Sequence, residues 1–259
     1  MSVKPFSLLA QVYDAIMTDI DYEAWGVFIL QTVESRGFKK AAVLDLGCGT
    51  GNSTYPMIAR GLEVVGLDAS EEMLEVARQK LPSLQFIQAD FKSFDLGKNF
   101  GLVYSVFDSI NNLLTDGDFF QMAGCVYQHL QVGGFFMFDV NTTIGLQDLW
   151  EAGRAEGWAG EVYYRWEHSF DEATGLAKVE AYCENEQTSF TEVHFERPYD
   201  APLLERLLKQ AGFKSIEILT YPDGDPANAD DERVWVVCQK IIKDSKLKVY
   251  NLQSNLCYL

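Results

Sequence analysis

The chain of 259 residues carries 21 basic and 38 acidic side chains, so its formal net charge at pH 7 is −17. This negative charge would repel the phosphate backbone of a nucleic acid, and we expect no nucleic-acid partner. Hydrophobic residues make up 47% of the sequence, which suits one packed fold and excludes a wholly disordered or fibrous chain. No apolar stretch reaches the roughly 18 residues of a membrane span, so we expect a cytoplasmic protein with no membrane partner.

The N-terminal stretch, residues 1–40, precedes the first strand that the pattern predicts. It holds aromatic and apolar side chains, among them Tyr13, Met17 and Trp25. An open α/β sheet leaves its ligand crevice uncovered at the carboxyl ends of the strands. We therefore expect this stretch to form a helical cover over a functional site.

From Val43 the sequence alternates short apolar runs with amphipathic stretches, a pattern typical of β-α units around a largely parallel sheet. A helix is expected from Ser70, as its N-cap, to Leu81, and Pro82 ends it. Another helix is expected over about 116–130. The predicted strands, rich in Val, Ile, Leu and Phe, are 41–46, 62–68, 84–90, 101–108 and 133–140.

After residue 140 apolar and polar residues alternate over long stretches, which indicates half-exposed antiparallel strands. The α/β pattern then resumes with a helix over 201–213, closed by Gly212, and two final strands at 214–219 and 232–240. We expect a Rossmann-like, mostly parallel seven-stranded sheet flanked by helices, with an antiparallel β-lid inserted after strand five. The expected parts are a core at 41–146 and 200–242, a substrate-covering lid at 147–199, and a tail at 243–259 of unknown role.

The most informative motif is VLDLGCGTGNST, a buried strand that runs into three glycines and then, we expect, an N-capped helix. Gly47, Gly49 and Gly51 are spaced by two, and glycine lets the backbone turn sharply and approach a ligand closely. Asp68 ends the next predicted strand, where a carboxylate commonly meets ribose hydroxyls in nucleotide-binding β-α-β units.

The residues around these glycines favour a methyl donor over a nicotinamide dinucleotide. The dinucleotide fingerprint G-x-G-x-x-G would require glycine at position 52, where Asn52 stands. Asp45, two residues before the first glycine, would repel a pyrophosphate but suits a ligand with an ammonium group. A structural role, in which Asp45 accepts hydrogen bonds from the backbone of its own turn, is an equal alternative.

Residues from Val43 to about Val140 resemble class I S-adenosylmethionine-dependent methyltransferases. VLDLGCGTG resembles their donor-binding loop. The resemblance implies that the three glycines lie against the methionyl part of the donor and that Asp45 helps to hold its ammonium group. It also implies that Asp68 accepts hydrogen bonds from both ribose hydroxyls.

Three further stretches carry the same resemblance. The sequence QAD is similar to the family's third landmark, which implies that Asp90 meets the adenine amino group and that Phe91 lies beside the ring. FDSINNL is similar to the fourth landmark, which brings Phe107 and Asp108 close to the donor and the reacting centre. VYDAIMTDIDYEAW resembles a branch that methylates small molecules such as amino sugars and amino acids, in which the tyrosine at Tyr13 reaches toward the donor's carboxylate.

We therefore expect methyl transfer from S-adenosylmethionine, with S-adenosylhomocysteine as product, to a small molecule by in-line displacement. The absence of a convincing general base favours an amine nitrogen, because an alcohol would need one. Asp108, Asn111 and His168 are the candidate catalytic residues. Neither the histidines nor the cysteines have a metal-ligand spacing, so no metal is expected. A donor-binding sensor or scaffold without turnover, a nicotinamide-dependent oxidoreductase, and a monomer or a homodimer stay open.

Overall fold

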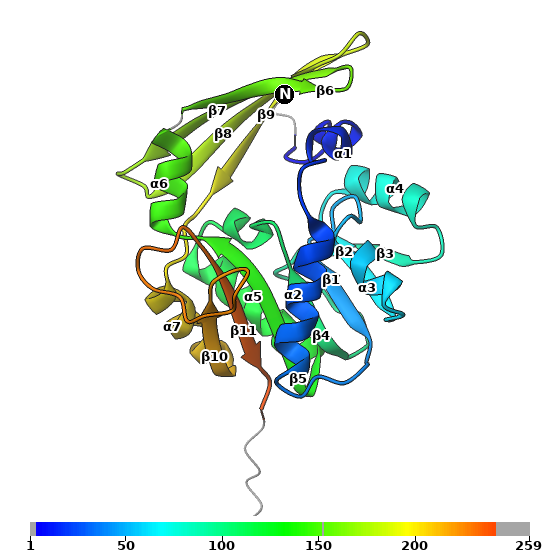
Figure 1. Ribbon diagram of the computed structural model, residues 1–259, viewed down its shortest axis with the longest axis vertical. Coiled ribbons are helices and arrows are strands. Elements are labelled where there is room, and N and C mark those ends of the chain that lie inside the picture. The colour runs from blue at the N-terminus through cyan, green and yellow to red at the C-terminus, as the bar shows by residue number, and fades with distance from the viewer. Residues whose placement is uncertain (1–3, 152, 242–259) are drawn as a thin grey trace, which may run out of the picture.

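The computed structural model describes residues 4–151 and 153–241. Its main sheet has seven strands in the order β10-β11-β5-β4-β1-β2-β3 (Figure 1). This confirms the expected Rossmann-like sheet. The strands are β1 (Val43–Leu46), β2 (Val64–Asp68), β3 (Gln85–Gln88), β4 (Phe100–Ser105), β5 (Leu130–Asn141), β10 (Lys214–Leu219) and β11 (Arg233–Gln239).

The sheet is parallel except at one edge. β1 pairs with β2 on one side and with β4 on the other, and β3 and β5 extend the sheet in parallel. β11 pairs antiparallel with both β5 and β10. Every residue of β1 and β4 is buried, because both faces of a central parallel strand are covered by helices. The strand order changes direction between β1 and β4, and open α/β sheets bind ligands beyond the carboxyl ends of strands at such a point.

Helices cover both faces of this sheet. α2 (Tyr22–Glu34) and α3 (Tyr55–Ala59) pack on one face, and α5 (Asp116–His129) and α7 (Ala201–Ala211) pack on the other. α4 (Glu71–Lys80) packs against Phe86 of β3.

Two of the expected helix boundaries are confirmed and one expected cap is not. The Ser70 hydroxyl accepts a hydrogen bond from the Met73 amide at 3.1 Å and caps α4. Gly212 is left-handed at the end of α7, as expected. The helix after the glycines, α3, has no side-chain cap. Thr54 stands at the capping position, but its hydroxyl donates to the buried carboxylate of Asp45 instead.

A second sheet has four antiparallel strands: β6 (Arg154–Ala159), β7 (Val162–Asp171), β8 (Leu176–Glu184) and β9 (Ser189–Glu196). It lies at one end of the molecule, beyond the α/β core (Figure 1). Along β8 and β9 the more buried residues tend to alternate with the more exposed ones, so every second side chain faces inward. α6 (Thr143–Glu151) leads from β5 into this sheet, and the boundary expected at Gln147 falls inside that helix.

The N-terminal segment, residues 4–22 up to the start of α2, lies between the two sheets. It forms a 3-10 turn, η1 (Leu9–Gln11), and the short helix α1 (Tyr13–Ile16), which lies beneath the four-stranded sheet (Figure 1). A second 3-10 turn, η2 (Ser109–Asn112), follows β4. In the described part of the chain, no helix is long and apolar enough to cross a membrane. The expected tail at 243–259 lies outside the described residues.

Candidate functional site

A cavity of about 30 Å³ lies beside the carboxyl ends of β1 and β4. The glycine loop forms part of its wall, and the N-terminal segment and the turn after β4 form the rest. Because these segments come from three separate parts of the chain, the fold is what assembles the cavity. Its lining residues are Tyr13, Tyr22, Gly47, Cys48, Gly49, Thr50, Asn52, Ser53, Val106, Phe107 and Ser109.

The glycine loop needs glycine for conformation and for space. All three glycines have positive φ, with values of 82° at Gly47, 51° at Gly49 and 85° at Gly51. A Cβ atom at Gly47 would lie 2.8 Å from the Phe91 ring and 3.0 Å from the Ser109 hydroxyl. Nothing lies within 4 Å of where a Cβ of Gly49 would stand. The loop thus lets Phe91 and Ser109 pack closely at Gly47 and leaves the backbone open at Gly49.

Asp45 lies beneath this loop and is fully buried. Its Oδ2 accepts hydrogen bonds from the hydroxyls of Ser53 at 2.8 Å and Thr54 at 2.7 Å. Its Oδ1 is buried without a hydrogen-bond partner among the described residues. Burial raises the pKa of this carboxyl to about 6, although the hydrogen bonds from the two hydroxyls oppose the shift. The loop's side chains, rather than its backbone, hold Asp45.

Asp68 stands at the end of β2 and is hydrogen-bonded to the glycine loop. Its Oδ2 accepts from the Gly49 amide and its Oδ1 from the Ser70 amide, each at 2.9 Å. Burial raises the pKa of this carboxyl, while the backbone hydrogen bonds lower it. Each oxygen keeps a further lone pair for a ligand hydroxyl.

Asp90 and Phe91 follow β3 and lie in different surroundings. The Asp90 side chain is 52% exposed, pairs with the Lys92 ammonium at 3.8 Å and accepts a hydrogen bond from the Lys92 amide at 2.8 Å. Phe91 lies against Gly47 instead. The structure thus brings Phe91 to the glycine loop, whereas Asp90 lies outside the lining of the cavity.

Two tyrosines of the N-terminal segment line the cavity, Tyr13 from α1 and Tyr22 from the start of α2. Burial raises the pKa of Tyr13 well above its ordinary value and that of Tyr22 to about 12. The Tyr22 ring lies edge-on to Phe107, with centroids 6.4 Å apart. The sequence interpretation assigned a role to Tyr13 but missed Tyr22, which stands in the same quoted motif.

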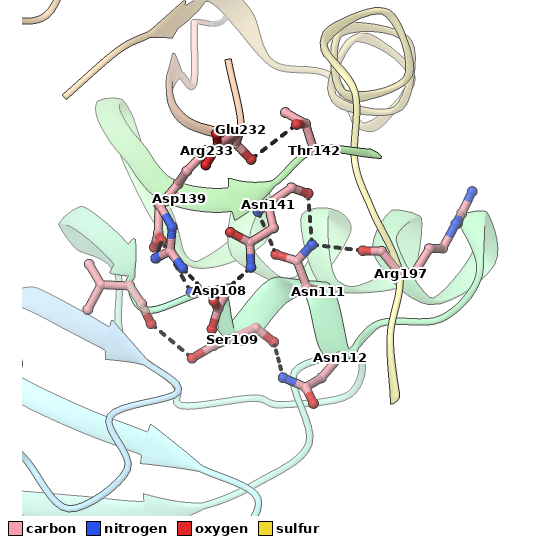
Figure 2. A network of polar contacts seen from close by, with 11 residues as sticks. Asp108, Ser109, Asn111, Asn112, Asp139, Asn141, Thr142, Arg197, Glu232 and Arg233 are labelled. Atoms are coloured by element: carbon pink, nitrogen blue, oxygen red, sulfur yellow. Dashed lines mark hydrogen bonds and ion pairs between the residues drawn. The ribbon is translucent and has the colours of Figure 1, made fainter. Parts of the chain in front are cut away.

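Phe107 and Asp108 both have left-handed backbones, with φ values of 60° and 50°. This conformation costs about 1–2 kcal/mol for each residue that carries a Cβ atom. The contacts of Asp108 hold the turn: its amide donates to Asp139 at 3.2 Å, and its carboxylate accepts from Arg233 at 2.6 Å and from Asn141 at 2.8 Å (Figure 2). Two donors thus engage one oxygen of Asp108, and these contacts favour a positioning role for this residue over the catalytic role considered from the sequence.

Arg233 connects the turn after β4 to β5 and β11. Its guanidinium donates to Asp108 and to Asp139, each at 2.6 Å (Figure 2). It also lies over the Phe107 ring, 5.9 Å from the centroid. Asp139 is almost fully buried, and burial raises its pKa to about 6 while the charge of Arg233 opposes that shift. The sequence offered one signal for Arg233, a single cation at the start of an otherwise apolar strand.

Asn111 is a fully buried connector between three elements. Its side-chain amide donates to the main-chain oxygens of Asn141 at 3.0 Å and Arg197 at 2.8 Å, and its oxygen accepts from the Asn141 amide at 3.0 Å (Figure 2). Both amide hydrogens therefore have main-chain partners. These contacts favour a positioning role for Asn111 over the catalytic role considered from the sequence.

Asp108, Asp139, Asn141 and Arg233 form a polar cluster after β4. Glu196, the last residue of β9, lies near this cluster, and the sequence interpretation missed it. Its Oε2 is buried without a hydrogen-bond partner among the described residues. Burial, and then the charge of Asp108, raise its pKa to about 8, against opposing contributions from Arg233 and Asn141. A signal was present: Glu192, His194 and Glu196 alternate along the strand, so they share one face.

His168, the third catalytic candidate, lies elsewhere. It stands on β7 and lines a separate hollow of about 340 Å³ on the four-stranded sheet, together with Gly153, Arg154, Glu167, Ser169 and Glu180. Burial lowers its pKa. The hollow is larger than the cavity at the glycine loop but shares none of its lining residues. The structure therefore does not bring His168 to the other candidates.

Comparison with known sequences finds methyltransferases. A family model described as a methyltransferase domain matches residues 43–134. YqeM of Bacillus subtilis, described as a methyltransferase, is 30% identical over 241 residues, which cover 89% of this chain and 95% of that protein. A dTDP-3-amino-3,4,6-trideoxy-alpha-D-glucopyranose N,N-dimethyltransferase of Streptomyces venezuelae is 34% identical over 127 residues, 48% of this chain and 54% of that enzyme.

Solved structures give the same result. An S-adenosylmethionine-dependent methyltransferase from Clostridium acetobutylicum superposes with a TM-score of 0.80 at 26% identity, covering 90% of this chain and 98% of that one. The sugar N-methyltransferase KedS8 from a Streptoalloteichus species shares the fold, with a TM-score of 0.78 at 23% identity, over 93% of this chain and 97% of that one. These matches support an enzyme rather than a sensor, and none of them is to an oxidoreductase.

Proposed function

Because the chain belongs to the family of S-adenosylmethionine-dependent methyltransferases, we propose that it transfers the donor's methyl group to an amine nitrogen of a small molecule. The donor supplies an electrophilic methyl group on a positively charged sulfur. The observation that carries the proposal is the cavity at the switch point of the sheet, with the glycine loop on one side and an excess of carboxylates beyond Phe107 on the other.

The residues of the glycine loop suit this donor. The open backbone at Gly49 gives a ligand close access, and the unpartnered Oδ1 of Asp45 lies beneath the same loop. Asp68 holds Gly49 through its amide and has lone pairs left for ribose hydroxyls. We assign Gly47, Gly49, Gly51, Asp45 and Asp68 to donor binding. Phe91, Phe107 and Tyr13 complete this set as groups that pack over the donor, and Asp90 stays a prediction for the adenine end.

The protein's contribution to the reaction is to align the two reactants and to exclude water. Alignment of two groups in an enclosed site corresponds to effective molarities of roughly 10⁵ M or more. Tyr13 and Tyr22 cover the cavity from the N-terminal segment, and the left-handed turn at Phe107 brings an aromatic ring to its wall. A rigid wall on one side and a covering segment on the other fit the need for a water-poor site.

An amine acceptor suits the charges beside the cavity. Asp108, Asp139 and Glu196 gather there with Arg233, so carboxyl groups outnumber guanidinium groups. Such a site attracts an ammonium group and repels a carboxylate. The relatives named as N,N-dimethyltransferases of amino sugars methylate nitrogen, in line with this preference.

The test is to incubate the protein with donor labelled in its methyl group and with matched panels of amines, alcohols and carboxylic acids. We expect label to appear on an amine and S-adenosylhomocysteine to form in equal amount. Binding of S-adenosylhomocysteine, measured by calorimetry, is the control for a folded donor site. Transfer of label to carboxylic acids alone would contradict an amine acceptor while leaving the enzyme class intact.

A further inference from the structure

Beside Asn111, whose main-chain oxygen accepts a hydrogen bond from the Arg197 amide at 2.8 Å, Glu196 carries a buried carboxyl oxygen with no hydrogen-bond partner among the described residues. We propose that this side chain binds the ammonium group of the acceptor and removes its proton before methyl transfer. The inference deepens the function proposed above and rests on it. It assigns the acceptor side of the site to the four-stranded sheet, since Glu196 ends β9.

The charges that face Glu196 come from three other elements. Asp108, in the turn after β4, and Arg233, at the start of β11, act directly on Glu196, and Asp139 on β5 joins the group through its ion pair with Arg233. Arg233 is the countercharge in this group, and its ion pairs at 2.6 Å are with Asp108 and Asp139. Asn141, the neutral neighbour of Glu196, donates to Asp108 at 2.8 Å. The cluster thus commits Arg233 to Asp108 and Asp139, and Glu196 has no ion pair within the part of the chain that the structure describes.

The position of the cluster relative to the cavity suits a second reactant. Phe107 lines the cavity, and the next residue, Asp108, belongs to the cluster. Arg233 lies over the same Phe107 ring, 5.9 Å from its centroid, so a ring that lines the cavity also faces the guanidinium that pairs with Asp108 and Asp139. An amine held by Glu196 would therefore lie beside the cavity in which we place the donor.

The chemistry needs a proton acceptor at this place. An ammonium nitrogen has no free electron pair and cannot attack a methyl group. In the proposed step an N–H bond of the ammonium breaks, its proton goes to Oε2 of Glu196, and the electron pair stays on nitrogen. Nitrogen then bonds to the methyl carbon while the carbon-sulfur bond breaks and its electron pair returns to sulfur. Burial raises the pKa of Glu196 to about 8 in the empty site, so this carboxylate accepts a proton more readily than an ordinary glutamate does.

Kinetics of Glu196→Gln, with the amine found in the labelling panel, give the first test. Gln is neutral and similar in shape to a protonated Glu, so the fold should survive. We expect kcat/KM to fall at least about a hundredfold and the affinity for S-adenosylhomocysteine to stay unchanged. The acid limb of the wild-type pH profile has its inflection near 8. In the variant it should move to the pKa of the free amine, because only the neutral amine can then react. Glu186→Gln, a matched charge change at an exposed position in the turn before β9, should behave like the wild type.

Binding of a simple amine gives a second test that needs no knowledge of the natural acceptor. The pKa of the Glu196 carboxyl is followed by carbon-13 NMR of glutamate-labelled full-length protein with S-adenosylhomocysteine, and the resonance is assigned by its loss in Glu196→Gln. We expect cyclohexylammonium to lower that pKa by about one unit or more. Cyclohexanol, of the same shape but without charge, should leave it unchanged.

The outcomes separate the two proposals. If the wild type labels no amine, the proposed function fails, and the NMR titration still decides whether Glu196 binds an ammonium group. If the wild type labels an amine and Glu196→Gln does so at the same rate with the same pH profile, only the role of Glu196 is overturned. An unchanged Glu196 pKa in the presence of cyclohexylammonium likewise overturns it.

Discussion

The carboxylate of Glu192 on β9 accepts a hydrogen bond from the main-chain amide of Leu9 at 3.0 Å, across 183 residues of sequence. The amides of Phe6, Ser7 and Leu8 donate to the same carboxylate at 2.6–3.1 Å. Burial alone would raise the pKa of this fully buried group, but the His194 imidazole, 3.3 Å from Oε2, and hydrogen bonds from the amides of Leu9 and Phe6 outweigh it and the pKa is lowered. One charged side chain of the four-stranded sheet thus holds the segment that carries Tyr13.

Replacement of Glu192 should release this segment. Glu192→Ala removes all four amide contacts, and hydrogen bonds to a charged acceptor contribute about 1.5–3 kcal/mol each at most when buried. We expect amide exchange over residues 6–9 to accelerate roughly thirtyfold, which corresponds to about 2 kcal/mol of local opening free energy. Hydrogen-exchange mass spectrometry measures it.

The isosteric variant Glu192→Gln makes that experiment specific. Its remaining oxygen can still accept from Ser7, Leu8 and Leu9, whereas the amide nitrogen that replaces Oε2 cannot accept from Phe6. We expect a smaller acceleration, centred on residue 6. Equal exchange in both variants and the wild type would show that other contacts hold the segment.

Asp68 and Asp90 should differ in their importance for the donor. Asp68→Ala is expected to weaken binding of S-adenosylhomocysteine by about 1.5–3 kcal/mol, the scale of lost charge-assisted hydrogen bonds. Asp90→Ala, at a half-exposed position, should lose less than about 1 kcal/mol. Calorimetry measures both, and Asp68→Asn controls for the support that Asp68 gives to the Gly49 amide. Equal losses would mean that the two carboxylates hold the donor alike.

Asp45 should make stability depend on pH. Its pKa is about 6 in the folded chain and about 4 when unfolded, so between these values the native state binds more protons and stability falls as pH rises. A shift of about two units corresponds to about 2–3 kcal/mol. Asp45→Asn should remove this part of the fall, so urea unfolding at pH 4 and pH 7 should show a flatter profile than in the wild type. Asp139 adds a similar contribution in both proteins. Parallel profiles would show that Asp45 is ionised in the fold without penalty.

The sheet and its main helices were predictable because their signals are local. Buried parallel strands such as β1 and β4 need continuous apolar runs. The sequence predicts α4 from a capping serine, two glutamates in the first turn and a proline after the last turn. Thr54 shows where local rules stop. Its hydroxyl can either cap a helix or donate to Asp45. It donates to Asp45, because that buried carboxylate needs a hydrogen-bond donor.

Only the donor side of the site, formed by the glycine loop and Asp68, was predictable from sequence motifs. The glycine loop and Asp68 lie close in sequence, so their spacing indicates their contact. Glu192 and Glu196 lie an even number of residues apart along β9, which indicates that they share one face of the strand. The sequence does not say which distant segment each of them contacts. Those partners depend on how the four-stranded sheet lies over the core, which is set by contacts far apart along the chain.

Asp14 should control how fast the donor enters. Its carboxylate accepts from the Thr50 hydroxyl at 2.6 Å and the Asn52 amide at 2.9 Å and pairs with Lys80, so it ties α1 to the glycine loop. The cavity behind α1 has a volume of about 30 Å³, whereas roughly 10–15 Å³ on this measure already holds one water molecule. A donor is many times larger, so we expect α1 to move away from the loop when the donor binds.

Asp14→Ala should therefore make this opening more frequent. Loss of about 1.5 kcal/mol of contacts raises the open population roughly tenfold, and the association rate should rise by the same factor if opening limits entry. The release rate should rise at least as much, because Tyr13 then covers the site less firmly. Stopped-flow fluorescence can follow both rates through Trp25, whose ring lies 5.8 Å from Phe107. The control is Asp19→Ala, an exposed position in the same segment. If Asp14→Ala binds donor at the wild-type rate, then α1 does not gate entry of the donor. Entry would then take place beneath the four-stranded sheet, which also covers the carboxyl ends of the core strands.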